Sequence, residues 1–498
     1  MPPVATDPEQ SSRSRLSNTP FTSRAVLATL TVLALGTLTE HWHALGWLRI
    51  FHPLAATETG QRASAEPAAS VGEARISTET RTRSELAQPD SAAMRAEQAE
   101  LDRTRQAGDV PLPKIDAAEP PLPFADASGH ALDGFFRALS ATAHRRAHAI
   151  TRIAHFGDSI VVSDLVSGTL RRKLQTEFGD AGHGFMLIAN AWPAYFHNDV
   201  TRYATAGWSV SRIVGPYAED GLYGLGGVSF KADKNTLARF GTAKSGDFGR
   251  NVSQFVLDYL EQPSGGTLQI SVDGAPRALL DTRGPAKKSA YFSLDVPDGP
   301  HEFELYTKSG TSRAFGVVLE RDVPGVVLDA LGVQGARIRF LDKQDDAHWA
   351  EQLGWRKPDL LIYEFGANES GDGFLYPMAD YHRTMKDVLE QGKHALPGSS
   401  CLVIGAMDRA AKVGDEIVSM RVIPALVEEQ RKASAEVGCA FFDTYAAMGG
   451  AHSMPTWVRR GLGQADLTHP TGIGSEVIGN WIFRALMQSY NAYVKANP

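Results

Sequence analysis

The pattern of hydrophobic and polar positions changes along the chain, and its first clear feature is a strand followed by a helix. Residues 150–156 form a largely apolar run that ends at Gly157-Asp158-Ser159. Apolar side chains then recur at spacings of three and four between Val162 and Leu174, a period typical of a helix packed on a core. The pattern therefore predicts a serine at the carboxyl end of a strand, the edge where open α/β sheets carry their chemistry.

Residues 194–322 follow a different period. Short runs of alternating polarity are separated by turn signals such as Asp273-Gly274 and Ser309-Gly310. The clearest runs are residues 254–260, 267–272, 289–294 and 301–307. Regularly spaced short strands joined by such turns predict an antiparallel β-sandwich.

After residue 322 strands and helices alternate again. Apolar runs of strand length are separated by patterns of helix length; these runs are residues 326–331, 360–365, 401–406 and 439–442. Such alternation predicts a parallel sheet with right-handed crossovers and helices on both faces. We therefore expect one α/β domain, residues 124–193 and 323–498, with the sandwich of residues 194–322 inserted between its first and second strands.

The N-terminal part contains two further patterns. Basic residues precede an uncharged apolar run, residues 25–38, which predicts a secretory signal or a signal anchor within residues 1–54. We favour an uncleaved anchor whose N-terminus is cytoplasmic. Residues 55–123 are rich in small, polar and charged residues and have hardly any aromatic ones, which predicts a disordered linker. The folded body is then exported, either anchored in the inner membrane and facing the periplasm or secreted after signal cleavage.

Composition narrows the functional classes. The 498 residues carry a net charge of -7, so the sequence has no electrostatic footprint for nucleic acid. Cys401 and Cys439 both lie in apolar, strand-like runs, and we expect buried thiols rather than a disulfide. No CxxC motif or His/Cys cluster in the sequence predicts a zinc site.

The candidate chemistry lies at the ends of predicted strands. A serine becomes a nucleophile when a base lies within hydrogen-bond reach and a carboxylate orients that base. His469 and Asp466, three residues apart, supply a base and a carboxylate for Ser159. Gly335 and Asn368 follow neighbouring strands, whose carboxyl ends share one edge of a parallel sheet. The backbone N–H groups of Ser159 and Gly335 and the Asn368 amide would then donate to the oxyanion of an acyl transfer.

These segments resemble the four blocks of the SGNH (GDSL-type) hydrolases: Gly157-Asp158-Ser159, Gly335, Gly366-Ala367-Asn368 and Asp466-Leu467-Thr468-His469. The resemblance covers about residues 150–490. It implies a flavodoxin-like, three-layer α/β/α fold, with no metal and no organic cofactor. It also implies roles for the site residues: Ser159 as nucleophile, His469 as general base and acid, Asp466 as the residue that orients His469, and an oxyanion hole of Ser159, Gly335 and Asn368.

A plain turn capped by Asp158 or Ser159 is the alternative interpretation of the first block. Within the resemblance, Asp158 is expected to be a turn residue that forms local hydrogen bonds, without a catalytic role.

The inserted sandwich narrows the resemblance further. An exported SGNH domain interrupted by a carbohydrate-binding-like β module looks like the bacterial peptidoglycan O-acetylesterases, which remove acetyl groups from cell-wall sugars. We therefore expect a serine esterase that acts on an acetylated cell-envelope polysaccharide, contacts the membrane through its N-terminal segment and binds no nucleic acid. The alternatives are an O-acetyltransferase that uses the same acyl-enzyme, and a non-catalytic envelope protein that binds glycan through its sandwich.

Several single side chains have two interpretations each. His183 follows the first helix and is a candidate for substrate contact. Arg409 follows the fourth strand and is expected to be an exposed cation, with a substrate carboxylate as the alternative partner. Most aromatic residues of the sandwich are expected in its core or on a sheet face, with stacking on sugar rings as the alternative; they are Trp208, Tyr217, Tyr223, Tyr291 and Tyr306.

Overall fold

The computed structural model describes residues 123–232, 235–414 and 416–497. These residues belong to one compact unit of the chain, Ile76–Pro498. The predicted signal or anchor of residues 1–54 lies outside the described residues, as does almost all of the predicted linker of residues 55–123. Within the described ranges, no helix is both long and apolar enough to cross a membrane.

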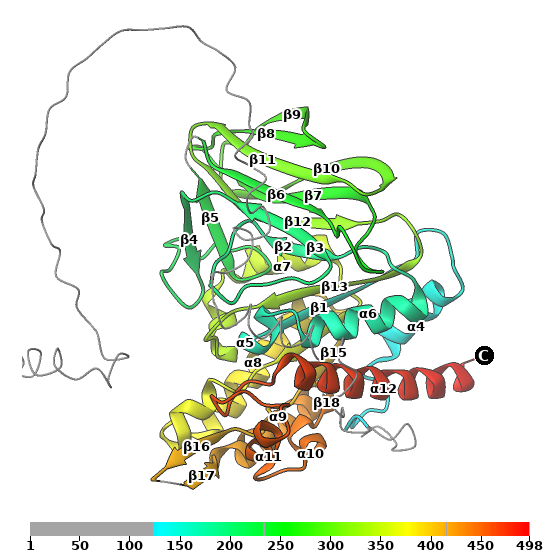
Figure 1. The fold of residues 1–498 in the computed structure, drawn as a ribbon, viewed down its shortest axis with the longest axis vertical. Helices are drawn as coiled ribbons and strands as arrows, with labels where there is room; N and C mark the ends of the chain where they lie inside the picture. The colour runs from blue at the N-terminus through cyan, green and yellow to red at the C-terminus, as the bar shows by residue number, and fades with distance from the viewer. Residues whose placement is uncertain (1–122, 233–234, 415, 498) are drawn as a thin grey trace, which may run out of the picture. The chain divides into compact units, whose positions relative to one another are not determined.

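A parallel sheet forms the centre of the α/β part (Figure 1), which confirms the predicted alternation of strands and helices. Its strands are β1 (Ile150–Gly157), β13 (Gly325–Gly332), β14 (Leu360–Glu364), β15 (Ser400–Ile404) and β18 (Ala440–Phe442). Neighbouring strands follow the order β13-β1-β14-β15-β18, and every pairing is parallel. Counted along the chain this order is 2-1-3-4-5, which one class of doubly wound sheets uses.

Helices cover both faces of this sheet. One hydrophobic cluster joins it to α4 (Asp133–Ala143), α6 (Val166–Phe178) and α12 (Gly472–Ala496). Another joins it to α7 (Asp346–Arg356), α8 (Met378–Ala395) and α9 (Val422–Val437). Successive residues of a strand point to opposite faces, so Ile362 of β14 belongs to the first cluster and Tyr363 to the second. Burial on both faces explains why these strands read as continuous apolar runs.

Between β1 and β13 the chain forms two antiparallel sheets. The larger has the order β10-β7-β12-β5-β4, with β2 paired to β12, and the smaller has the order β3-β6-β11-β8-β9. Their strands are β2 (Gly184–Leu187), β3 (Val200–Ala204), β4 (Trp208–Arg212), β5 (Val228–Ala232), β6 (Leu237–Thr242), β7 (Val252–Glu261), β8 (Thr267–Val272), β9 (Ala275–Asp281), β10 (Lys288–Gly299), β11 (Glu302–Ser309) and β12 (Ser312–Glu320). The sheets pack through their inner faces, where Phe255 stacks on Phe303 with ring centroids 5.3 Å apart. Strand β2 precedes residue 194, so the larger sheet includes a strand from before the predicted insertion.

The aromatic residues of these sheets have different environments. Tyr223 is buried, as expected for a core residue. Tyr291 stacks on Trp355 at the end of α7, with ring centroids 4.0 Å apart. Trp208 is half-buried and Tyr217 is exposed, so they remain available as surface groups.

Irregular segments gather at the carboxyl ends of the parallel strands. Helix α5 (Ser159–Val162) follows β1, the 3-10 helix η2 (Ile338–Lys343) follows β13, and η3 (Glu369–Leu375) follows β14. The remaining short elements are β16 (Ala410–Val413) and β17 (Glu416–Ser419), a hairpin after β15, and α10 (Thr444–Met448) and α11 (Ser453–Arg459). This edge is where doubly wound sheets bind their ligands.

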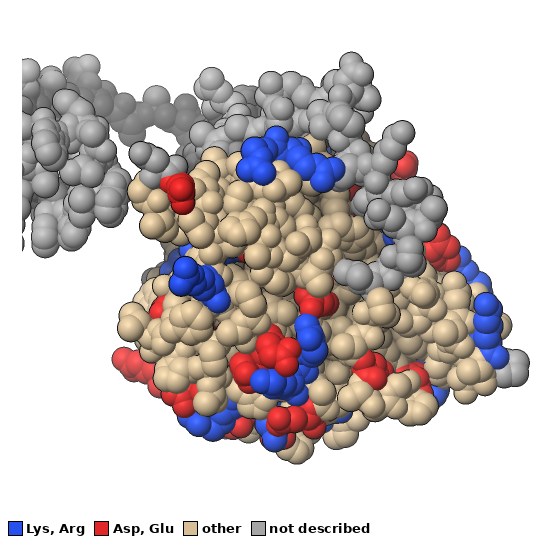
Figure 2. All heavy atoms as spheres, turned by 90° about the horizontal axis from the view of Figure 1, so that it is seen from below, with Lys and Arg blue, Asp and Glu red and all other residues tan. Residues whose placement is uncertain are grey.

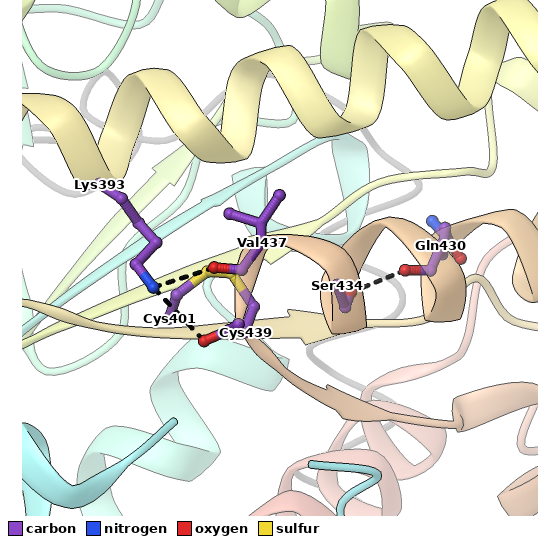
Figure 3. The surroundings of a disulfide bond; sticks show 7 residues. Lys393, Cys401, Gln430, Ser434, Val437 and Cys439 are labelled. Carbon is purple, nitrogen blue, oxygen red and sulfur yellow. Dashed lines mark hydrogen bonds between the residues drawn. A yellow bond between two sulfur atoms is a disulfide. The ribbon is translucent and has the colours of Figure 1, made fainter. Parts of the chain in front are cut away.

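Cys401 and Cys439 form a disulfide (Figure 3), so the expectation of two free thiols was wrong. Leu402 of β15 lies opposite Ala440 of β18, which puts the preceding cysteines side by side with their Cα atoms 4.7 Å apart. The expectation of burial was correct, because each cysteine is 1% exposed. The pairing depends on which strands are neighbours, and an apolar run does not specify its neighbour.

Charges of both signs are mixed on the face shown in Figure 2, where basic and acidic side chains lie beside one another. Ion pairs of the described residues include Arg431 with Asp443 at 2.5 Å and Lys386 with Glu436 at 3.1 Å. Pairs that stay partly exposed to solvent add little to stability.

Candidate active site

Ser159 lies at a sharp turn from strand to helix. β1 ends at Gly157 and α5 begins at Ser159. Asp158 caps this helix, because its Oδ1 accepts a hydrogen bond of 3.0 Å from the Ile160 N–H. A Cβ on Gly157 would come within 2.3 Å of Val161 Cγ2, so glycine is required there. The turn thus uses Asp158 as its cap and leaves the Ser159 hydroxyl for another partner.

Ser159, His469 and Asp466 form one chain of hydrogen bonds. Ser159 Oγ lies 2.7 Å from His469 Nε2, although the two residues are 310 positions apart in the sequence. His469 Nδ1 lies 2.5 Å from Asp466 Oδ2. A proton on Nδ1, held by Asp466, leaves the Nε2 lone pair directed at the serine hydroxyl. This is the arrangement of a nucleophile, its base and the carboxylate that orients the base.

The loop before α12 fixes the geometry of the base and the carboxylate. Asp466 Oδ1 accepts hydrogen bonds from the backbone N–H groups of Thr468, at 2.9 Å, and His469, at 3.0 Å. Leu467, between Asp466 and Thr468, has a φ of 60°, in the left-handed region that tight turns use. The same carboxylate therefore folds the loop and orients the imidazole, which explains how two side chains three residues apart can work together.

Burial and charge shift the pKa values of this pair in opposite directions. Burial would raise the pKa of Asp466, but hydrogen bonds from His469 and Thr468 outweigh it and bring that pKa to about 2. Burial would lower the pKa of His469, but the hydrogen bond and charge of Asp466 outweigh it, so that pKa is raised. Asp466 is therefore ionised at neutral pH and stabilises the imidazolium that forms when His469 takes a proton.

Gly335 and Asn368 follow the two strands that flank β1. Asn368 Nδ2 donates a hydrogen bond of 2.9 Å to the carbonyl of Ala336 and a longer one of 3.4 Å to Asp158 Oδ2. One amide thus links the residue after Gly335 with the residue before Ser159. Gly335 is exposed, and a Cβ there would meet no atom within 4 Å. The expected oxyanion donors lie on adjoining loops, and their donation to a substrate oxygen stays a prediction.

Two further contacts fasten the Gly335 loop to the Asn368 loop. Arg337 forms two hydrogen bonds to the Asp372 carboxylate, of 2.8 and 2.6 Å. Glu369 Oε1 accepts a hydrogen bond of 2.8 Å from the Ile338 N–H. Bidentate pairs fix orientation as well as distance. Sequence analysis missed Arg337 and Asp372 because their role depends on contact between loops 35 residues apart.

Arg409 links two loops of the site instead of projecting into solvent as expected. It is half-buried, and its Nε donates to Thr468 Oγ1 at 3.0 Å. Its Nη1 donates to the Ala367 carbonyl at 2.7 Å and to Ser370 Oγ at 3.0 Å. The Arg409 charge also opposes protonation of His469. In the sequence, only the position of Arg409 after a predicted strand indicated that it could lie near the site.

A buried carboxyl group lies directly behind the nucleophile. Asp158 is 1% exposed, and burial raises its pKa to about 7, opposed by the Ile160 N–H and reinforced by the negative charge of Glu369. Glu369 is also buried, and burial raises its pKa to about 7. Burial therefore favours the protonated form of both carboxyl groups.

His183, a candidate for substrate contact, is buried in a separate cluster. Its Nε2 lies 2.8 Å from His197 Nδ1, and burial lowers the pKa of both rings, that of His197 to about 3. Asp164 lies close enough to complete a group of three potential metal ligands. However, Arg171 pairs with both Asp164 oxygens, at 2.8 and 2.7 Å. A cation would have to compete with that guanidinium, so we describe the group as a buried polar cluster.

The comparison with solved structures finds similar proteins, whereas the comparisons with family models and curated proteins find none. No family model matches the sequence, and no curated protein matches it significantly. A solved structure of a peptidoglycan O-acetylesterase is similar at a TM-score of 0.63 and 20% identity, over 74% of this chain and 99% of that chain. The chain shares its fold.

Two other solved structures are similar at lower scores. A family two carbohydrate esterase from Cellvibrio japonicus has a TM-score of 0.25 and 13% identity, over 59% of this chain and 98% of that chain. A lipase/acylhydrolase from Enterococcus faecalis has a TM-score of 0.25 and 19% identity, over 33% of this chain and 77% of that chain. Scores this low establish no shared fold.

Proposed function

We propose that this protein is a serine esterase of the SGNH type that removes O-acetyl groups from a cell-envelope polysaccharide, with peptidoglycan as the first candidate. The observation that carries the proposal is the 2.7 Å contact between Ser159 Oγ and His469 Nε2, with Asp466 behind the imidazole. The sheet order 2-1-3-4-5 and the two helical layers are consistent with a flavodoxin-like α/β/α fold. The fold shared with a peptidoglycan O-acetylesterase supports a carbohydrate ester as the substrate.

The proposed reaction has two steps. His469 Nε2 takes the Ser159 proton as Oγ attacks the acetyl carbonyl, and the N–H groups of Ser159 and Gly335 and the Asn368 amide stabilise the oxyanion. The sugar alkoxide then leaves with the proton from His469, and the acetyl group remains on Ser159. Water, activated by His469, attacks this acetyl-enzyme and releases acetate.

We also propose that the protein acts outside the cytoplasm, either anchored through residues 25–38 or secreted after cleavage. The Cys401–Cys439 disulfide supports this location, because disulfides form and persist in oxidising compartments such as the periplasm.

The proposal is tested by acetate release from the purified full-length protein. The substrates are O-acetylated peptidoglycan and acetylated xylan, each with and without an unacetylated sugar acceptor. Ser159→Ala should abolish release. Ser163→Ala is the matched control, because Ser163 lies at the other end of α5 and its Oγ contacts only the Ile160 carbonyl in the described structure, at 3.4 Å.

Each outcome has a distinct meaning. Ser159-dependent release that prefers peptidoglycan supports the proposal with its substrate. Release that is weak without acceptor, together with acetyl transfer when acceptor is present, assigns an O-acetyltransferase instead. Unchanged release by Ser159→Ala refutes a catalytic role for this serine. No reaction by the parent protein in either arm, with glycan binding retained, assigns a non-catalytic glycan-binding protein instead.

A further inference from the structure

The Asp158 carboxyl group lies between the turn that carries the nucleophile and the Asn368 amide. It is almost completely buried. Its Oδ1 accepts a hydrogen bond of 3.0 Å from the Ile160 N–H, and its Oδ2 lies 3.4 Å from Asn368 Nδ2. One carboxyl group therefore contacts both the helix that begins at Ser159 and an amide that the proposed reaction uses as an oxyanion donor.

No basic side chain neutralises this carboxyl group. A buried carboxylate is stable when a cation pairs with it and further hydrogen bonds satisfy its oxygens. Asp164 and Asp329 meet this condition, because each receives two hydrogen bonds from one arginine, Arg171 and Arg356 respectively. Among the described residues, no lysine or arginine forms a hydrogen bond or an ion pair with Asp158. Its one firm donor is a backbone N–H, which is little support for a buried charge.

Titratable and charged groups face Asp158 from five other parts of the fold. They are Glu364 at the end of β14, Glu369 at the start of η3, Tyr381 of α8, Arg409 after β15 and His469 before α12. Burial has the largest effect and raises the pKa of Asp158 to about 7; the two glutamates add to this rise, whereas the Ile160 N–H and His469 oppose it. These surroundings therefore favour the neutral carboxylic acid.

The contact between Asp158 and the Asn368 amide has the length expected for a neutral partner. Charge-assisted hydrogen bonds are short, about 2.7–2.9 Å, whereas this contact is 3.4 Å long. The same Nδ2 donates to the Ala336 carbonyl at 2.9 Å, which leaves one amide hydrogen for a substrate oxyanion. A charged Asp158 would attract that hydrogen and would also repel the oxyanion, because both are negative.

We propose that Asp158 is a positioning residue that works as a neutral carboxylic acid, leaving one Asn368 N–H free for the oxyanion until Asp158 ionises. Asp158 acts through Asn368 and contacts no reacting atom. Its effect on turnover rests on the proposed esterase function, whereas its protonation state does not. Since the carboxylate forms as the pH rises, kcat should fall at high pH, and we name this the alkaline fall.

The test is the pH dependence of kcat for a small chromogenic acetate ester, measured with the full-length protein. In the parent protein the alkaline fall should be about 10- to 100-fold, less than the complete loss of an oxyanion donor would cause. Asp158→Asn keeps an oxygen for the Ile160 N–H but cannot ionise, so its alkaline fall should disappear. Glu369→Gln removes a negative charge that favours neutral Asp158, so its alkaline fall should begin at lower pH.

Asp359→Asn is the matched control. Burial also raises the pKa of Asp359, and its Oδ2 likewise accepts a hydrogen bond from a backbone N–H, that of Arg152, at 2.9 Å. Asp359 precedes β14, whereas Asp158 follows β1, so the two aspartates lie at opposite ends of the parallel sheet. Asp359→Asn should therefore keep the alkaline fall of the parent protein. Thermal unfolding shows whether each variant is folded.

Loss of the alkaline fall in folded Asp158→Asn, with Asp359→Asn like the parent protein, supports the proposal. An alkaline fall that persists in Asp158→Asn, or that is absent from an active parent protein, overturns it. If Asp158→Asn does not fold, Glu369→Gln decides, because an alkaline fall at the same pH as in the parent protein also overturns the proposal.

A measurement without turnover separates this proposal from the esterase proposal. Infrared difference spectra between low and high pH should contain a carboxylic-acid band that Asp158→Asn lacks and Asp359→Asn keeps. Absence of that band overturns the proposal. If the band is present but the parent protein shows no Ser159-dependent hydrolysis of the ester, the result counts against the esterase and leaves the neutral Asp158 established.

Discussion

Asn368 Nδ2 donates a hydrogen bond of 2.9 Å to the carbonyl oxygen of Ala336, and this contact joins the loops that follow two strands of the parallel sheet. The second contact of the same amide, to Asp158 Oδ2, is 3.4 Å long and lies beyond the usual range for an N–H donor. The amide therefore has one firm partner, which fixes its position, and one weak partner, which a substrate oxyanion can replace.

Replacing Asn368 tests its role as an oxyanion donor. Asn368→Ala should lower kcat by about 10²- to 10³-fold with a smaller change in KM, because the donation develops in the transition state. Asn368→Asp keeps the shape but brings a carboxylate to the same place, and it should lose at least as much. Steady-state kinetics with a small acetate ester measure both variants. A kcat close to that of the parent protein in either variant contradicts the assignment.

The pH profile reports the pairing of His469 with Asp466. His469 must be neutral to accept the serine proton, so kcat/KM should fall as the pH drops below the raised pKa of His469. Asp466→Asn removes the charge that raises this pKa, so the fall of kcat/KM at low pH, the acid limb of the profile, should move to lower pH. The same change should lower kcat by about 10³- to 10⁴-fold, since the imidazole loses its orienting partner. An acid limb that stays in place in Asp466→Asn would show that another group controls the profile.

Arg409 is expected to act as a positioning residue for two loops of the site. Arg409→Met removes its hydrogen bonds to Thr468, Ala367 and Ser370 and should lower kcat by about 10- to 100-fold. It also removes a positive charge that lowers the pKa of His469, so the acid limb should move to higher pH. Arg409→Lys keeps the charge and should lower kcat with little change in the limb. If Arg409→Met and Arg409→Lys had identical pH profiles, the charge of Arg409 would have no effect on His469, and its role would be purely structural.

The disulfide should stabilise the α/β part. Cys401→Ala together with Cys439→Ala should lower the free energy of unfolding by roughly 4 kcal/mol, because a cross-link across 38 residues restricts the unfolded chain. Chemical denaturation measures the change. The control is a reductant, which should lower the stability of the parent protein towards that of the double variant and leave the double variant unchanged. Equal stability of the oxidised parent and the double variant would contradict this role.

Gly157 and Gly354 form a matched pair for testing the turn before Ser159. A Cβ at Gly157 would meet Val161 Cγ2 at 2.3 Å and the Glu364 carbonyl at 2.8 Å, so Gly157→Ala should destabilise the protein by about 1–3 kcal/mol. A Cβ at Gly354, within α7, meets no atom within 4 Å, so Gly354→Ala should stabilise it by about 0.5–1 kcal/mol. Thermal unfolding compares them, and similar effects of the two substitutions would show that β1 and α5 can move apart.

Local pattern was enough to predict much of this molecule. The period of apolar residues depends on burial of near neighbours along the chain, so it indicated β1, the helix after it and the alternation of strands and helices after residue 322. Parallel sheets then require their carboxyl ends to share an edge, which is why Ser159, Gly335, Asn368 and the Asp466–His469 loop were expected together. Asp466 and His469 were the easiest of these residues to predict together, because they lie on one loop and the backbone between them determines most of their relative geometry.

The amino-acid sequence by itself determined the element types, the buried positions and the short segments that supply a nucleophile, a base and a carboxylate. The tertiary structure alone decided which distant segments touch: Cys401 with Cys439, Arg337 with Asp372, and Arg409 with Thr468. The structure also places Arg409 between two loops of the site, where an exposed cation was expected, and it places His183 against His197, where contact with substrate was a candidate role. The physical reason is that an apolar run determines that a strand is buried, whereas strand order and loop packing determine its neighbours, and those contacts are formed only when the whole core assembles.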